Sequence, residues 1–185
     1  MLRRLTEADL SAVLTVQAEA HAPELHEGAE TFAALLQLCP RACVGIEAAD
    51  GCGLDGYLFA HPASTRHLPN AFDASSKHGD VKGDDDNEEH DHDIFYLHDV
   101  ALRRRARARG HVARLLRAAL DESLRLELDR LALTAVHGAE AFWSRLGFRP
   151  VALSMLPADA RTRLASYPAS TAAVFMTADR QQVAA

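Results

Sequence analysis

The sequence predicts an α/β (α+β) domain with a central mixed, twisted sheet of six to seven strands. The first observation behind this prediction is the order of the expected elements, βααβββαβαββ. The second is a strand–helix–strand segment at 94–136, which must form a right-handed parallel crossover. The third is the composition, since 185 residues with 48% hydrophobic and 25% charged side chains suit one core. We therefore expect residues 1–185 to form a single domain.

The first half of the chain predicts two helices and three strands. Thr6 and Asp9 have the spacing of a capping box at the start of the first helix. Apolar residues at helical spacing give both helices a core face, and Pro40 ends the second. The expected strands are 2–5, 43–48 and 54–62, with a hairpin turn at 50–53 between the last two.

The second half alternates strands with helices. The apolar segment 94–102 predicts a strand, and a long amphipathic helix begins near Gly110. A short helix at 137–148 ends at Gly147, which is a typical helix C-cap residue. The other expected elements are strands at 130–136, 151–156 and 172–178, with a short helix around 158–165.

Residues 64–93 interrupt this pattern. They are polar and turn-rich without periodicity, which predicts a disordered insertion between two strands. Residues 77–93 carry two lysines and eight carboxylates, which accounts for the whole net charge of −6. The rest of the chain is neutral, so we expect no nucleic-acid partner. Although His90 and His92 stand among carboxylates, the composition favours a solvated segment, and no metal is expected.

The remaining composition points to a reduced compartment. Three cysteines give neither a disulfide framework nor the spacing of a zinc site. The N-terminus lacks the apolar core of a signal peptide, and no apolar run is long enough to span a membrane. We expect a cytoplasmic monomer or homodimer with no membrane partner.

An arginine-rich turn, VALRRRARARGHVARLL at 100–116, predicts an anion site. The first turn of a helix leaves backbone N–H groups unpaired, and the helix dipole adds positive potential there. Gly110 lets the backbone approach a phosphate closely. We therefore expect residues 107–113 to bind phosphate, whereas Arg103, Arg104 and Arg105 fit a solvated surface equally well.

Several segments resemble the GNAT acetyltransferases. RARGHV at 107–112 is similar to their R-x-x-G-x-G/A acetyl-CoA loop, and LGF at 146–148, after AEAFW, is similar to their second signature. The segments LCP (38–40), GYLFAHP (56–62) and YLHDVAL (96–102) resemble the arylalkylamine N-acetyltransferase branch. The resemblance covers nearly the whole chain. It implies the GNAT fold, with a splayed parallel strand pair that binds acetyl-CoA.

The resemblance also implies which residues contact coenzyme A. The backbone of Val100, Ala101 and Leu102 would pair with the pantetheine arm. Two positions depart from the family pattern: Val112 stands where the family prefers glycine or alanine, and Ala108 stands where glycine is common. Trp143 stands where a tyrosine is usual, and its indole cannot act as an acid near neutral pH, so it would be a wall of the site. The amides that would hold the pyrophosphate belong to Arg107, Ala108, Arg109, Gly110, His111, Val112 and Ala113.

His98 is the predicted general base, since its ordinary pKa suits neutral pH. The resemblance supports it, because arylalkylamine acetyltransferases carry a histidine at the matching position. Strand alternation would place Tyr96, His98 and Val100 on one face, and Leu97 and Asp99 on the other. The alternative for His98 is a structural buried histidine. Asp99 is a second candidate base or ammonium ligand, or else part of a salt bridge.

Two further roles belong to the acceptor and the leaving thiolate. Tyr96 or water would protonate the thiolate. In the loop at 21–28, Glu24 and His26 would bind a cationic acceptor, although a solvated acidic loop explains them as well.

Together these features predict an N-acetyltransferase that moves acetyl from acetyl-CoA to a primary amine, a small arylalkylamine or a polyamine. No cysteine stands where a covalent intermediate would form, so direct attack in a ternary complex is expected. The alternatives are a non-catalytic acyl-CoA-binding or regulatory protein, and a protein N-terminal or lysine acetyltransferase.

Overall fold

A computed structural model describes residues 1–66 and 92–184. Most of the expected insertion, 67–91, therefore lies outside the described residues, as does its cluster of acidic residues. The two ends of the insertion lie together, because the carboxylate of Asp93 accepts a hydrogen bond from the backbone N–H of Thr65 at 2.6 Å. The expected insertion thus joins two neighbouring antiparallel strands, β3 (Leu54–Ala63) and β4 (Ile94–Leu102).

The predicted mixed sheet is confirmed. Seven strands lie in the order β1-β2-β3-β4-β5-β7-β6. Within the described part of the chain, β4 and β5 form the one parallel pair, and α3 is the crossover between them. The strands are β1 (Leu2–Arg4), β2 (Val44–Glu47), β3 (Leu54–Ala63), β4 (Ile94–Leu102), β5 (Arg130–Ala135), β6 (Arg149–Pro150) and β7 (Val174–Asp179).

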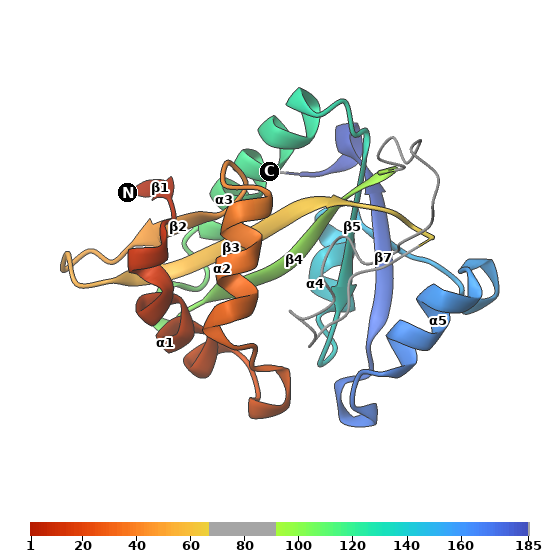
Figure 1. The fold of residues 1–185 in the computed structure, drawn as a ribbon, viewed down its shortest axis with the longest axis horizontal. Coiled ribbons are helices and arrows are strands. Elements are labelled where there is room, and N and C mark those ends of the chain that lie inside the picture. The colour runs from red at the N-terminus through yellow and green to blue at the C-terminus, as the bar shows by residue number, and fades with distance from the viewer. Residues whose placement is uncertain (67–91, 185) are drawn as a thin grey trace, which may run out of the picture.

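Helices cover both faces of the sheet (Figure 1). On one face, α1 and α2 pack over the β1–β4 half of the sheet and α5 packs over the β5 and β7 end. On the other face, α3 and α4 close the main core. The bounds are α1 (Leu10–Ala20), α2 (Ala29–Leu38), α3 (His111–Arg125), α4 (Glu140–Arg145) and α5 (Ala158–Ala165).

The amphipathic pattern of α3 explains its position. Leu115, Leu116 and Ala119 fall on one face of this helix and are completely buried. Each fully buried leucine contributes about 1.5–3 kcal/mol relative to an exposed one. Near the N-terminus, in the turn directly before α1, Thr6 and Asp9 form the predicted capping box.

The predicted strand at 151–156 is wrong. The strand in this region, β6, is limited to Arg149–Pro150, and a 3-10 turn follows at Leu153–Met155. Pro150 has no N–H to donate to a ladder, and β6 is an edge strand of the sheet. Leu153 and Met155 are exposed, and only the ends of this apolar run, Val151 and Leu156, pack against the core beside α5.

No helix in residues 1–66 and 92–184 is both long enough and apolar enough to cross a membrane.

Candidate active site

A β-bulge in β4 changes the direction in which the side chains of His98 and Asp99 point. In the ladder with β3, Asp99 pairs with Phe59 and Leu97 pairs with Ala60, so His98 is an extra residue without a partner in β3. Leu97 and Val100 both pack in the main core, three positions apart rather than two. His98 and Asp99 therefore both reach the face that carries α1 and α2. The simple alternation, which put Asp99 on the face opposite His98, is wrong for this reason.

Beside the bulge, β4 and β5 separate. Among the described residues they pair only through 95–97 of β4 and 131–133 of β5, although β4 continues to Leu102 and β5 to Ala135. The edge of β4 that faces β5 thus has no strand partner over its last residues. A pocket of about 390 Å³ lies here and is lined from both strands and from the loop after α1. That volume is within the range of small-molecule sites.

Asp99 is held by two side chains. One carboxylate oxygen accepts a hydrogen bond from the Tyr57 hydroxyl at 2.7 Å, and the other lies 2.8 Å from Nε2 of His21. Burial alone would raise the pKa of Asp99, but its hydrogen bonds and the positive charge of His21 outweigh burial and lower it. Burial also lowers the pKa of His21, yet the hydrogen bond and charge of Asp99 raise it overall.

His98 has a carboxylate partner of its own. Its Nε2 lies 3.0 and 3.1 Å from the two carboxylate oxygens of Glu27. Both side chains are nearly buried, with 8% of His98 and 7% of Glu27 exposed. Burial would lower the pKa of His98, but the charge and the hydrogen bond of Glu27 outweigh it and raise that pKa.

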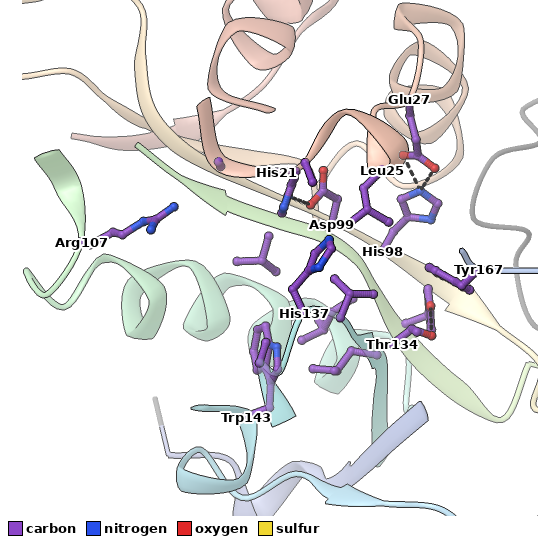
Figure 2. Close-up of a pocket in the computed structure, with 18 residues that line it drawn as sticks. His21, Leu25, Glu27, His98, Asp99, Arg107, Thr134, His137, Trp143 and Tyr167 are labelled. Carbon is purple, nitrogen blue, oxygen red and sulfur yellow. Dashed lines mark hydrogen bonds and ion pairs between the residues drawn. The ribbon is translucent and has the colours of Figure 1, made fainter. Parts of the chain in front are cut away.

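Two histidine–carboxylate pairs connect the loop after α1 to the bulge of β4 (Figure 2). The loop supplies a histidine, His21, to the strand carboxylate Asp99. It also supplies a carboxylate, Glu27, to the strand histidine His98. The two pairs line the same pocket, so two imidazoles, each with a carboxylate behind it, face one ligand space.

Hydroxyl groups and Trp143 form other walls of the pocket. The Tyr96 hydroxyl lies 2.9 Å from the Thr134 hydroxyl, and Tyr167 lines the pocket beside them. Burial raises the pKa of Tyr96 and raises that of Tyr167 well above its usual value. Trp143 is 9% exposed, packs edge-on against Phe148, and lines the pocket.

The arginine-rich turn lies at the end of the pocket where β4 runs out. Arg107 lines the pocket, and Figure 2 shows it at one side of the cluster. Gly110 caps α3 with φ at +72°, a left-handed conformation that favours glycine. Val112 packs against the main core, which directs its side chain away from the turn's exposed surface. The helix α3 then begins at His111, so the first-turn amides open next to the exposed residues Arg107, Ala108 and Arg109.

Ala108 is strained in this turn, because its φ is +60°. A left-handed conformation costs an L-residue about 1–2 kcal/mol, while glycine loses only about 0.5–1 kcal/mol of backbone entropy. We expect Ala108→Gly to raise the free energy of unfolding by about 0.5–1 kcal/mol in urea titrations. The matched control is Ala118→Gly within α3, which should lower it by about 1 kcal/mol. Equal destabilisation by both changes would contradict the strain.

Other predicted site residues lie outside the pocket. Glu24 is exposed and accepts a weak hydrogen bond from Ser170 at 3.5 Å, while His26 contacts the backbone carbonyl of His21 at 3.1 Å. Leu25 and Glu27 of the same loop line the pocket instead. Of the predicted backbone contacts, Val100 lines the pocket, whereas the side chain of Ala101 packs under α1 and α2.

Of the first three arginines in the run, two are engaged in ion pairs. Arg105 pairs with Asp55 at 2.8 Å and with Asp50 at 3.4 Å. Arg103 lies 3.9 Å from Glu19. These contacts fit the alternative of a solvated structural surface for this part of the run.

Sequence reasoning assigned no catalytic role to several residues in or beside the pocket. His21 and Glu27 were visible as members of a polar loop, but their partners lie more than 70 positions away. Tyr57 sits in an apolar strand and Thr134 in a buried one, where nothing marks a polar role. His137, which lines the pocket, adopts a φ of +51° and starts the turn before α4, so that helix is shorter than the predicted 137–148. Within residues 1–66 and 92–184, no group of histidine, cysteine and carboxylate side chains is arranged to hold a metal ion.

Comparison with known proteins identifies the fold. The model of the Acetyltransferase (GNAT) family matches residues 78–148. A search of curated proteins finds no match. Among solved structures, the GphF GNAT-like decarboxylase in complex with isobutyryl-CoA is 14% identical, with a TM-score of 0.64 over 97% of this chain and 99% of that one.

Two further solved structures are similar to the same degree. Naa20 of Chaetomium thermophilum, in complex with a bisubstrate analogue, is 15% identical, with a TM-score of 0.65 over 98% of this chain and 87% of that one. The ribosomal-protein-S18-alanine N-acetyltransferase of Escherichia coli is 16% identical, with a TM-score of 0.60 over 100% of this chain and 95% of that one. At such low sequence identities the similarity shows a shared fold. The parallel strands β4 and β5 separate, and a glycine-capped turn precedes α3. The family match covers both features, and we conclude that the chain has the GNAT fold.

Proposed function

We propose that this chain is an N-acetyltransferase that moves an acetyl group from acetyl-CoA to a small primary amine. The observation that carries the proposal is the pocket between the separated ends of β4 and β5, which faces two carboxylate-backed imidazoles. A solved structure of similar fold contains isobutyryl-CoA, which supports an acyl-CoA ligand for this gap.

The chain offers coenzyme A two kinds of group. The unpaired edge of β4, at Val100, Ala101 and Leu102, has backbone N–H and C=O groups that an extended pantetheine arm would satisfy. The turn from Arg107 to Ala113 provides first-turn amides, the α3 dipole and exposed guanidinium groups for the pyrophosphate. Trp143 would border the arm.

The charge of the pocket favours a cationic acceptor without a carboxylate. Glu27 and Asp99 line it, and among the described residues that do so Arg107 is the one arginine or lysine. Because Arg107 stands at the coenzyme end, no basic side chain except histidine remains to pair with an acceptor's carboxylate. This supports the arylalkylamines and polyamines suggested by the sequence over amino acids, with Glu24 and His26 outside the pocket mouth.

His98 is our proposed base. Both oxygens of Asp99 are engaged, by Tyr57 and His21, so that carboxylate is better suited to orient His21 than to take a proton. Tyr96 remains the proposed partner of the leaving thiolate together with water, and its raised pKa favours water as the donor.

Acetyl-CoA should raise the melting temperature of the protein, because a ligand that binds only the folded state stabilises it by about 2.7 kcal/mol at a hundredfold excess over Kd. Gly110→Pro should remove this shift, since proline fixes φ near −65° where +72° is needed. Thiol release with a panel of amines would then identify the acceptor. A thermal shift without thiol release would favour a non-catalytic acyl-CoA-binding protein, and no shift at millimolar acetyl-CoA would overturn the proposal.

A further inference from the structure

One ring nitrogen of His98 is engaged and the other is not. Nε2 contacts both carboxylate oxygens of Glu27 at 3.0 and 3.1 Å. Nδ1 is buried, and no group in the described part of the chain forms a hydrogen bond with it. An unpaired buried polar atom costs about 1–3 kcal/mol, and His98 is one of the residues that line the pocket, so a ligand there is a candidate partner for this nitrogen.

The partner of Nε2 decides which nitrogen carries the proton. An ionised carboxylate only accepts hydrogen bonds, so a histidine facing it must present an N–H. In the neutral ring this places the single proton on Nε2 and leaves the lone pair on Nδ1. Glu27 is itself held in place, because its backbone N–H donates to the buried side chain of Gln17 at 3.1 Å.

The other titratable groups around His98 leave this arrangement undisturbed. His61 of β3 and Tyr96 of β4 face the ring, with centroids 5.7 and 6.3 Å away. Nδ1 of His61 lies 2.8 Å from the backbone carbonyl of Pro62. Asp99, the next residue, is engaged by His21 and Tyr57, so Glu27 is the one carboxylate among the described residues that bonds to the His98 ring.

We infer that Glu27 is a positioning residue that holds His98 as its Nε2–H tautomer and makes Nδ1 the atom that accepts the proton of the acceptor amine. The inference rests on the proposed function. As the amine nitrogen bonds to the acyl carbon, its N–H bond breaks and the proton moves to the Nδ1 lone pair. The electron pair of the C–S bond leaves with the sulfur. Nε2–H stays directed at Glu27, whose charge stabilises the imidazolium.

Nitrogen-15 NMR of the full chain labelled at histidine tests the tautomer without any ligand. Above the pKa of His98, we expect its Nε2 to carry the proton and its Nδ1 to be bare, with the signals assigned by their loss in His98→Gln. In Glu27→Gln the amide can donate as well as accept, so the single tautomer should be lost. A wild-type His98 with its proton on Nδ1 would overturn the inference, whatever the variants do.

The pH profile of kcat/KM gives a second readout, with tyramine as the acceptor probe, or spermidine if tyramine is not acetylated. Neutral His98 is the active form, so activity rises with pH through its pKa. Removing the Glu27 charge lowers that pKa, and in Glu27→Gln the rising limb should move to lower pH while the plateau falls. Glu27→Asp, which keeps the charge, should restore much of the wild-type limb, and Glu30→Gln at the exposed start of α2 should leave it unchanged.

Two outcomes separate this inference from the proposed function. An active wild-type enzyme whose limb is unmoved by Glu27→Gln would overturn the role of Glu27 alone. Absence of thiol release from the wild type with every amine would overturn the proposed function and, with it, Nδ1 as a proton acceptor.

Discussion

Replacing His98 by alanine should lower kcat/KM for an amine acceptor by about 10²- to 10⁴-fold, the usual effect of losing a general base. The amine arrives mostly as ammonium at neutral pH, and His98 lines the pocket with a carboxylate behind it. The deficit should shrink at high pH, where more of the amine is already unprotonated. Initial rates of thiol release from pH 6 to 9 would measure both effects.

The coenzyme provides the control for this change. The thermal shift by acetyl-CoA should persist in His98→Ala, since the arginine-rich turn is untouched. Asp99→Asn is the matched variant on the neighbouring position. Near-normal activity in His98→Ala, combined with a large loss in Asp99→Asn, would assign the base to Asp99 and refute our assignment.

Replacing Gly147 by alanine should destabilise the fold by about 3 kcal/mol or more. Gly147 has φ at +99°, where an L-residue is strained by about 1–2 kcal/mol. An added Cβ would also lie 2.2 Å from the backbone carbonyl oxygen of Gln182. That oxygen cannot move alone, because the C-terminal segment is tied to Leu146, whose carbonyl accepts the N–H of Ala184 at 3.1 Å. Urea titration would measure the loss.

Gly110→Ala is the control that separates the backbone strain of a positive φ from the steric clash with Gln182. Gly110 has a similar conformation, with φ at +72°, but nothing lies within 4 Å of an added Cβ. It should therefore cost about 1 kcal/mol, which is the strain reduced by the entropy that glycine loses on folding. If Gly147→Ala and Gly110→Ala lowered the free energy of unfolding equally, the clash with Gln182 would contribute nothing to the loss.

Much of the fold follows from local patterns in the sequence. Helical spacing located α3, Gly110 marked its start, and the segment 94–136 required a parallel crossover. The strand expected at 151–156 is absent, because the strand β6 ends at the edge-strand Pro150 and a 3-10 turn follows that exposes Leu153 and Met155. Hydrophobicity alone does not distinguish an apolar strand from an apolar turn whose ends are anchored in the core.

The chemistry of the pocket was predictable in part. His98 and Asp99 were identifiable as candidates because a strand that ends before a predicted anion-binding turn brings its last side chains to the site. Their direction was not, since alternation assumes an unbroken ladder and the bulge adds one residue. The partners Glu27 and His21 were also hidden, because a loop's composition shows that it is polar without showing which of its side chains turn inward.

The bulge also makes the site depend on chain length. In the ladder between β3 and β4, the pairs Phe59–Asp99 and Ala60–Leu97 would become consecutive if the chain lost one residue between them. A one-codon deletion there would leave a more regular sheet, with all its other rungs in register, and would remove the imidazole from Glu27. Among descendants of such a gene, the domain would fold normally while the position of the proposed base was missing. A gap of one position in β4 would therefore indicate loss of the proposed activity more clearly than substitutions along the rest of the strand.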